Sequence, residues 1–258
     1  MKLSASNIAW PFEQDGEMLA LLKSLRFDGL EIAPTRLFPE APYTHSDQAQ
    51  SYAAKLLEQY GLRVSSMQSI LFGITQNLFG SKDDRAFLRD YLFQAIDFAK
   101  GLGCDNLVFG CPKNRIMGDK SQYGMAVEFF SGLGEYAVQQ NTVLSIEAVP
   151  VIYGANFLNI TAEACAFVRD VGHPGCMVNA DTGTMVYNDE PFSVLERNAD
   201  LIHHIHLSEP NLAPIHQREW HKRLRELPFE GYLSLEMRNT ERLEDVQDAL
   251  AYLREVAA

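Results

Sequence analysis

The stretch LIHHIHLSEP, residues 201–210, contains an apolar run that opens into a polar, acidic loop. Its apolar side chains predict a short buried strand. These are Leu201, Ile202, Ile205 and Leu207. Because side chains alternate along a strand, His204 and His206 should point to one face and His203 to the other. A neutral imidazole at such a strand end can bind a divalent metal, although a lone buried histidine more often bonds a main-chain carbonyl.

Three other apolar strands in the same half of the chain end in an acidic residue. They are VLSIEAV with Glu147, CMVNAD with Asp181, and YLSLEM with Glu236. Each acid alone would be an ordinary salt-bridged side chain, but the repetition indicates one shared site. If the strands are parallel, their carboxyl ends meet at the same edge of the sheet, and His206 joins the three acids there.

Short apolar strands alternate with longer amphipathic helices along the whole chain. The sequence predicts strands at 2–9, 30–33, 62–70, 105–110, 143–147, 176–181, 201–207 and 232–236. Eight strand–helix units without a linker predict a parallel sheet with right-handed crossovers. At this length the pattern favours an α/β fold, a single (β/α)8 TIM barrel over residues 1–258 with its metal site at the carboxyl ends of strands five to eight, over a doubly wound open sheet.

Three local expectations accompany this fold. Thr161 should cap the helix after the fifth strand. The segment DTGTMVYNDEP, residues 181–191, should form a loop before a helix over 192–198. A further helix should include Trp220 and Leu224.

Composition limits the functional classes. The chain has 258 residues, 47% hydrophobic and 22% charged, with a net charge of −12. Such an acidic balance argues against nucleic acid and against an anionic membrane surface as partners. No apolar run approaches the ~18 residues of a membrane span. The four cysteines form no C-x-x-C pair, and the N-terminus does not resemble a secretory signal, so a cytoplasmic location is expected.

The four residues at the strand ends suit a metal ion. Glu147, Asp181 and Glu236 would repel one another if they converged without a cation. An oxygen-rich set with one imidazole suits Mn²⁺, Mg²⁺ or Co²⁺ better than structural zinc. We therefore expect one divalent metal ion, with Mn²⁺ favoured and Mg²⁺, Co²⁺ or Zn²⁺ as alternatives.

The motifs IEAVP, NADTGT, HIHLSEP and LSLEM also resemble those of the xylose-isomerase-like superfamily of sugar isomerases and epimerases. The resemblance follows the strand order of the whole chain, and its specific motifs lie in residues 143–237. It implies that Glu147, Asp181, His206 and Glu236 hold one metal ion. It also implies that Glu147 and Glu236 act as the catalytic acid–base pair.

Two positions depart from the epimerases of that superfamily. They place a histidine three residues after the aspartate of the sixth strand, where this chain has Thr184. They also have an arginine shortly after the histidine of the seventh strand, where this chain reads SEPNLAPI. Both family residues touch sugar oxygens, so the substrate should differ here. The nuclease branch of the superfamily needs further histidines at its strand ends. The third and fourth strands here end in SI and FG, so a nuclease is not expected.

Six residues on the predicted top-face loops are candidates for substrate binding. Lys113 and Arg115 could neutralise a phosphate or carboxylate, or be solvated loop cations. Glu209 could support His206, act as an additional acid, or lie at the rim. Tyr153, Asn156 and Trp10 could line a sugar pocket or simply pack.

The residues and the resemblance together predict a sugar or sugar phosphate isomerase or epimerase. A metal that chelates a carbonyl and its neighbouring hydroxyl acidifies the C–H between them and stabilises the enediolate. One glutamate removes the proton and the other returns it. A sugar or polyol dehydratase on the same site and a non-catalytic sugar-binding barrel are the alternatives. The resemblance also implies a homodimer or homotetramer.

Overall fold

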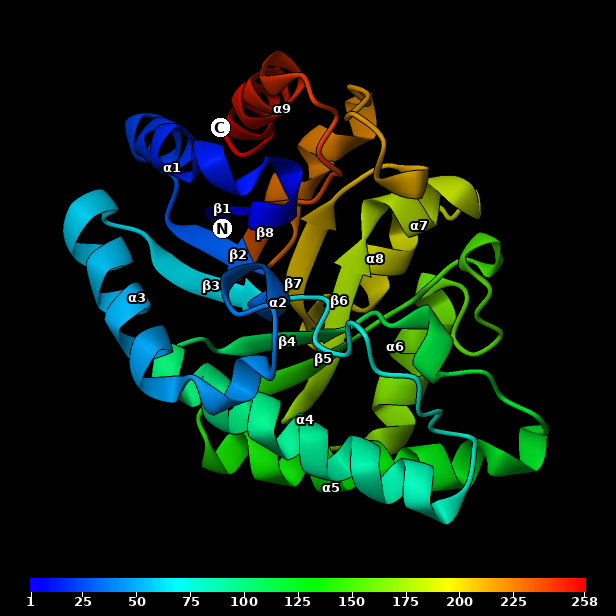
Figure 1. Cartoon of the computed structure of the whole chain (residues 1–258). Helices are drawn as coiled ribbons and strands as arrows, with labels where there is room; N and C mark the ends of the chain where they lie inside the picture. The colour runs from blue at the N-terminus through cyan, green and yellow to red at the C-terminus, as the bar shows by residue number, and fades with distance from the viewer.

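The computed structural model describes residues 1–258, and its eight strands pair in chain order to form a closed barrel (Figure 1). Every pairing is parallel, and the pairing of β8 with β1 closes the barrel. The predicted (β/α)8 TIM barrel is therefore confirmed. The strands are β1 (Lys2–Ser6), β2 (Gly29–Ile32), β3 (Arg63–Met67), β4 (Asn106–Phe109), β5 (Val143–Glu147), β6 (Cys176–Asp181), β7 (Ile202–Leu207) and β8 (Tyr232–Leu235).

Helices surround the barrel and cover its outer face (Figure 1). Their ends carry the expected signals: Ser81 and Asp84 form a capping box before α4, and Gly103 ends that helix at a φ of 65°. The helices are α1 (Asp15–Ser24), α2 (Pro34–Leu37), α3 (Ser46–Tyr60), α4 (Lys82–Leu102), α5 (Tyr123–Gln139), α6 (Thr161–Val171), α7 (Thr182–Tyr187), α8 (Ser193–Arg197) and α9 (Leu243–Val256).

Short 3-10 helices occupy several connections. They are η1 (Asn7–Ala9), η2 (Phe12–Gln14), η3 (Pro42–Thr44), η4 (Pro112–Asn114), η5 (Lys120–Gln122), η6 (Val151–Tyr153), η7 (Ala199–Leu201), η8 (Pro210–Leu212) and η9 (Glu219–Glu226).

The two faces of the strands differ in polarity. In β1, Leu3 and Ala5 belong to the apolar core. The intervening Ser4 is buried in hydrogen-bond contact with Ser65, at 2.5 Å between the hydroxyl oxygens. Further round, Asn106 Nδ2 donates to Ser66 Oγ at 2.9 Å. Alternation along each strand thus places aliphatic side chains under the helices and a polar layer inside the barrel.

Three local expectations were wrong in detail. The predicted loop at 181–191 contains α7, because the Asp181 carboxylate accepts the Thr184 amide and caps a short helix. The predicted helix at Trp220 and Leu224 is the 3-10 helix η9. Thr161 is the first helical residue rather than the cap of α6.

The carboxylate of Glu190 supplies the capping bonds of α6 instead. It accepts hydrogen bonds from the Thr161 and Ala162 amides at 2.8 and 3.2 Å. The capping acceptor therefore comes from another part of the chain, which the local sequence around Thr161 could not indicate.

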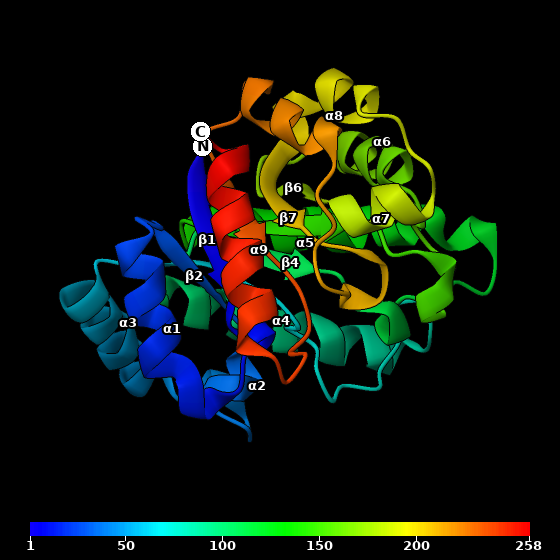
Figure 2. The same ribbon diagram turned by 90° about the horizontal axis from the view of Figure 1, so that it is seen from above.

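The two termini lie together on one side of the barrel, beside β1 and α9 (Figure 2). Helix α9 packs against both β1 and β8, so it covers the seam at which the barrel closes. None of the helices combines the length and apolar character needed to cross a membrane.

Candidate metal centre

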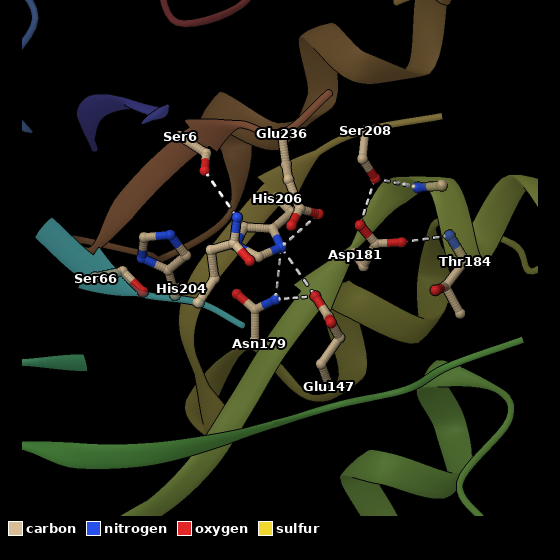
Figure 3. A network of polar contacts seen from close by, with 12 residues as sticks. Ser6, Ser66, Glu147, Asn179, Asp181, Thr184, His204, His206, Ser208 and Glu236 are labelled. Carbon is tan, nitrogen blue, oxygen red and sulfur yellow. Dashed lines mark hydrogen bonds and ion pairs between the residues drawn. The ribbon is translucent and has the colours of Figure 1, made fainter. Parts of the chain in front are cut away.

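Four side chains converge at the carboxyl ends of consecutive strands (Figure 3). Glu147 and Asp181 are the last residues of β5 and β6, His206 is the penultimate residue of β7, and Glu236 directly follows β8. Parallel pairing aligns Asp181 with His206 across neighbouring strands. One ligand atom from each of the four lies within 4.8 Å of the others. The structure therefore brings all four predicted ligands together.

His206 is at the centre of this group and is fully buried. Its Nδ1 lies 2.9 Å from Glu147 Oε1 and 3.2 Å from Glu236 Oε2. Burial disfavours the charged imidazole, but the Glu236 and Glu31 carboxylates outweigh it and raise the pKa of His206 well above its usual value. The two carboxylates therefore favour the charged form of the ring in the metal-free protein.

The carboxylates are held in an environment that disfavours their charge. Burial and the neighbouring Glu147 raise the pKa of Asp181 from 3.8 to about 6. Burial also raises the pKa of Glu147 and of Glu236, although His206 opposes this in both cases. A cation in this position would relieve the repulsion, since three buried carboxylates have one imidazole among them.

The donor set fits a divalent ion. Asp181 keeps a fixed orientation because its Oδ1 accepts the Thr184 amide at 2.5 Å and its Oδ2 accepts the Ser208 hydroxyl. Three hard carboxylates and one imidazole match the preferences of Mn²⁺, Mg²⁺ or Co²⁺ and lack the thiolates typical of structural zinc. Glu147, Asp181, His206 and Glu236 are the residues that could hold such an ion.

A cavity of about 510 Å³ opens above the four residues and exposes Glu147, Asp181 and Glu236 at its floor. Its walls come mainly from the segments after β3, β4 and β5 and include Leu71, Phe72, Ile74 and Val149, among other apolar residues. Of the predicted substrate-binding residues, Lys113, Tyr153 and Glu209 line it. Lys113 is the only lysine or arginine in the lining.

The structure does not bring the other three predicted substrate-binding residues to the cavity. Arg115 is fully buried, and its Nη2 donates to the main-chain oxygen of Glu147 at 2.8 Å. Trp10 is buried too, and its Nε1 donates to Asp15 Oδ1 at 2.8 Å. The Asn156 amide pairs with the main chain of Met117 at 2.7 and 2.8 Å.

Glu209 reaches the cavity, but other residues already hold its carboxylate. Arg218 Nη2 donates to Oε2 at 2.6 Å, and Arg218 Nε donates to Oε1 at 3.2 Å. The His216 amide also donates to Oε1, at 3.2 Å. Glu209 therefore fixes the loop after β7, with its charge paired.

Sequence reasoning missed two buried neighbours of His206. Glu31 lies in β2, and its Oε2 is 2.9 Å from His206 Nε2. Asn179 Nδ2 donates to Glu147 Oε1 at 2.5 Å and lies 3.1 Å from His206 Nδ1. Glu31 is flanked by apolar residues in GLEI, residues 29–32. An acidic residue inside a buried strand is rare, so this position could have indicated a partner for a buried polar group.

A closed parallel barrel with carboxylates and an imidazole at its carboxyl edge defines a (β/α)8 barrel with a candidate metal centre. The chain belongs to the xylose isomerase-like TIM barrel family, whose model matches residues 19–256. The resemblance stated from the sequence motifs is therefore confirmed. A search of curated proteins finds no match to this sequence.

Solved structures of sugar epimerases share the fold over nearly their whole length. A D-psicose 3-epimerase has a TM-score of 0.79 and 21% identity, over 100% of this chain and 99% of that chain. A 3-keto-D-glucoside 4-epimerase from E. coli has a TM-score of 0.78 and 19% identity, over 99% of each chain. An L-ribulose 3-epimerase has a TM-score of 0.74 and 16% identity, over 99% of this chain and 91% of that chain.

Proposed function

We propose that this protein is a metal-dependent isomerase or epimerase of a sugar or sugar phosphate. The observation that carries the proposal is the convergence of Glu147, Asp181, His206 and Glu236 within 4.8 Å at the floor of a cavity. The similar structures named as epimerases of psicose, ribulose and a ketoglucoside support the same class of reaction.

In this proposal the four residues chelate one divalent ion, Mn²⁺ by preference. When bound, such an ion supplies Lewis-acid polarisation of a substrate carbonyl. Glu147 and Glu236 then move the proton, because each faces the cavity and has a pKa raised towards neutrality, chiefly by burial.

The two glutamates come from β5 and β8 and reach His206 from opposite sides in the view of Figure 3. A proton removed by one and returned by the other to the same carbon inverts that centre, which is epimerisation. Return to the adjacent carbon is aldose–ketose isomerisation.

The cavity supports a substrate with an anionic group as well as hydroxyls. Lys113 is exposed and has no ion-pair partner in the structure, so it is available to a phosphate or carboxylate. Thr184 cannot replace the family histidine as a flexible donor, since its hydroxyl donates to the Ala148 carbonyl at 3.1 Å.

An additional free acid would favour the dehydratase alternative, and Glu209 is the residue that could supply it. Its two oxygens are instead engaged by Arg218 and by the His216 amide. This arrangement favours proton return over loss of water.

Exchange of substrate hydrogen with solvent deuterium tests the proposal. Protein loaded with Mn²⁺, Co²⁺ or Mg²⁺ is incubated in D₂O with ketoses, aldoses and their phosphates, and NMR follows loss of the C–H signal. We expect one substrate class to exchange and Glu236→Gln to abolish the exchange. A barrel that only binds sugar would show no exchange with any of them and would keep its ligand affinity in Glu236→Gln.

A further inference from the structure

We infer that Glu31 is a positioning residue that fixes the tautomer of His206, so that the Nδ1 lone pair faces the metal centre. The inference rests on the proposed metal-dependent function. It assigns a role to a β2 carboxylate that is fully buried and does not line the cavity.

The geometry on the two sides of the imidazole carries the inference. Glu31 Oε2 lies 2.9 Å from Nε2, whereas Glu147 and Glu236 approach Nδ1. A neutral imidazole has one N–H and one lone pair, and a carboxylate can only accept. When a cation engages Glu147 and Glu236, Glu31 is the one carboxylate left to accept an N–H from the ring, so the proton stays on Nε2. The lone pair is left on Nδ1, the nitrogen that faces the other three ligands.

The Glu31 carboxylate is too poorly paired to be explained by stability alone. This argues for a role at the metal centre. It is fully buried, and its Oε1 has no hydrogen-bond partner. Its remaining contact is with His204 Nε2 at 3.1 Å, and the two histidine rings lie edge to face at 5.3 Å between centroids. A buried charge with one oxygen unsatisfied costs stability, and an apolar residue would fill the same space at lower cost.

Asn179 contacts the imidazole on the side of the proposed metal. Its Nδ2 lies 3.1 Å from His206 Nδ1 and donates to Glu147 Oε1. A side-chain amide nitrogen only donates, so Asn179 cannot accept a proton from Nδ1. On the Nδ1 side, Glu147 or Glu236 accepts the proton of the charged ring, and a bound metal would take the place of that proton.

The first experiment measures metal affinity without reference to activity. Metal-free wild type, Glu31→Gln and Glu31→Asp are titrated with Mn²⁺ by calorimetry at one pH. We expect Glu31→Gln to bind on the order of 10–100-fold more weakly, because its neutral amide can donate as well as accept and no longer selects one tautomer. Glu31→Asp keeps an acceptor-only carboxylate and should recover part of the loss.

Glu190→Gln is the matched control. Glu190 also accepts two hydrogen bonds, from the Thr161 and Ala162 amides, but none of its hydrogen bonds involves the four proposed ligands. We expect this variant to lose stability while keeping wild-type Mn²⁺ affinity. Equal affinity losses in Glu31→Gln and Glu190→Gln would overturn the inference, since general destabilisation would then explain both.

The second experiment observes the tautomer. Long-range ¹H–¹⁵N spectra of histidine-labelled protein loaded with diamagnetic Zn²⁺ should show His206 with a protonated, exchange-protected Nε2 and a metal-bound Nδ1. Glu31→Gln should lose that protected Nε2–H. Metal on Nε2, or an unchanged spectrum and affinity in the variant, would overturn the inference. If Glu31→Gln does not fold, the wild-type spectrum decides by itself.

Failure of this inference can be told apart from failure of the proposed function. Exchange activity in wild type with unchanged Mn²⁺ affinity in Glu31→Gln refutes the role of Glu31 alone. Metal binding that depends on Glu31, without exchange of any sugar, refutes the function alone. A wild-type protein that binds no divalent metal refutes both.

Discussion

His206 contacts three carboxylates, and removal of its ring would change the environment of each. Glu31 and Glu147 lie 2.9 Å from opposite ring nitrogens, and Glu236 lies 3.2 Å from Nδ1. Breaking a buried ion pair from one side leaves the other charge uncompensated. We therefore expect the ring to contribute to the stability of the metal-free barrel and, at the proposed site, to its affinity for a metal.

His206→Ala should reduce both quantities. We expect Mn²⁺ affinity to fall by about 100-fold or more, because a metal ligand is lost together with the neighbours it orients. We also expect about 3 kcal/mol less stability in the metal-free state, since Glu31 loses its closest partner. Calorimetry and urea unfolding measure the two effects. A variant that retains wild-type metal content would refute the four-ligand centre.

Asp181 should make the metal-free protein less stable as pH rises. Burial and Glu147 raise its pKa from 3.8 to about 6, so the folded state keeps a proton that the unfolded chain has released. The resulting stability is complete below pH 3.8 and lost as pH rises through about 6. Asp181→Asn should therefore gain about 2–3 kcal/mol over wild type above that range. A stability difference between the two that does not change with pH would contradict this assignment.

Gly110 leaves room for the Glu147 carboxylate. A Cβ built at Gly110 would lie 2.0 Å from Glu147 Oε2, which is the far end of a flexible side chain. Gly110→Ala should therefore displace the carboxylate while the fold absorbs the change. We expect a stability change within about 1 kcal/mol and a Mn²⁺ affinity reduced on the order of 10-fold. A large loss of stability with unchanged Mn²⁺ affinity would show that Gly110 is needed for the fold and not for the position of the Glu147 carboxylate.

The convergence of the four candidate ligands could be predicted from sequence because each lies at or next to the end of an apolar strand, and strand ends meet at one edge of a parallel sheet. The surrounding residues could not. Arg115 and Trp10 follow strands in the same way as a pocket residue would, yet their side chains turn into the core and bond Glu147 and Asp15. Which way a loop side chain turns depends on partners distant in sequence.

At the scale of elements, α7 and the end of β7 lock together around Asp181. The Gly183 amide donates to Ser208 Oγ at 2.9 Å, and the Thr182 hydroxyl donates to the Ser208 carbonyl at 2.9 Å. The Ser208 hydroxyl in turn donates to Asp181. The short helix therefore has a direct part in orienting a proposed metal ligand.

Gly183 is required for this close approach. A Cβ there would lie 2.8 Å from the Glu209 carbonyl carbon and from Ser208 Oγ. Gly183→Ala should destabilise the protein by about 1–3 kcal/mol and weaken metal binding through Ser208. Gly132→Ala in the exposed part of α5 is the control, because its Cβ meets nothing within 4 Å. It should stabilise by about 0.5–1 kcal/mol. Equal changes in the two variants, measured by urea unfolding, would refute the packing argument.

The sequence predicted the strands better than the short helices. Strands β5 to β8 are indicated by short runs rich in apolar residues, which are typical of a buried parallel sheet. Helix α7 lies in DTGTMVYNDEP, where Thr, Gly and Asp have low helix propensity and resemble a loop. It forms because Asp181 caps it and Ser208 holds it, and one of those contacts comes from another strand.

At the scale of the whole molecule, the barrel concentrates negative charge. The chain carries a net charge of −12, and the cavity is lined by four carboxylates against one lysine. A concave site with one sign of charge attracts counterions of the other sign. The barrel itself could be predicted from eight regular strand–helix units and their total length. The charge balance of its interior needed the structure, because Glu31 in β2 lies three strands before the nearest predicted ligand, Glu147 in β5, in sequence order.

Metal removal should therefore lower the thermal stability of the whole barrel. A ligand that binds only the folded state adds about 2.7 kcal/mol when present at 100 times its dissociation constant. For a chain of this size that corresponds to roughly 5–10 °C in Tm. We expect EDTA to lower the Tm of metal-loaded wild type by this amount and Mn²⁺ to restore it. The double variant Glu147→Gln/Asp181→Asn should show one Tm with either addition, because it has lost two carboxylate ligands and the repulsion that a cation relieves. An equal response of wild type and double variant, followed by differential scanning calorimetry, would place the metal elsewhere on the chain and remove the basis for an isomerase site at the barrel mouth.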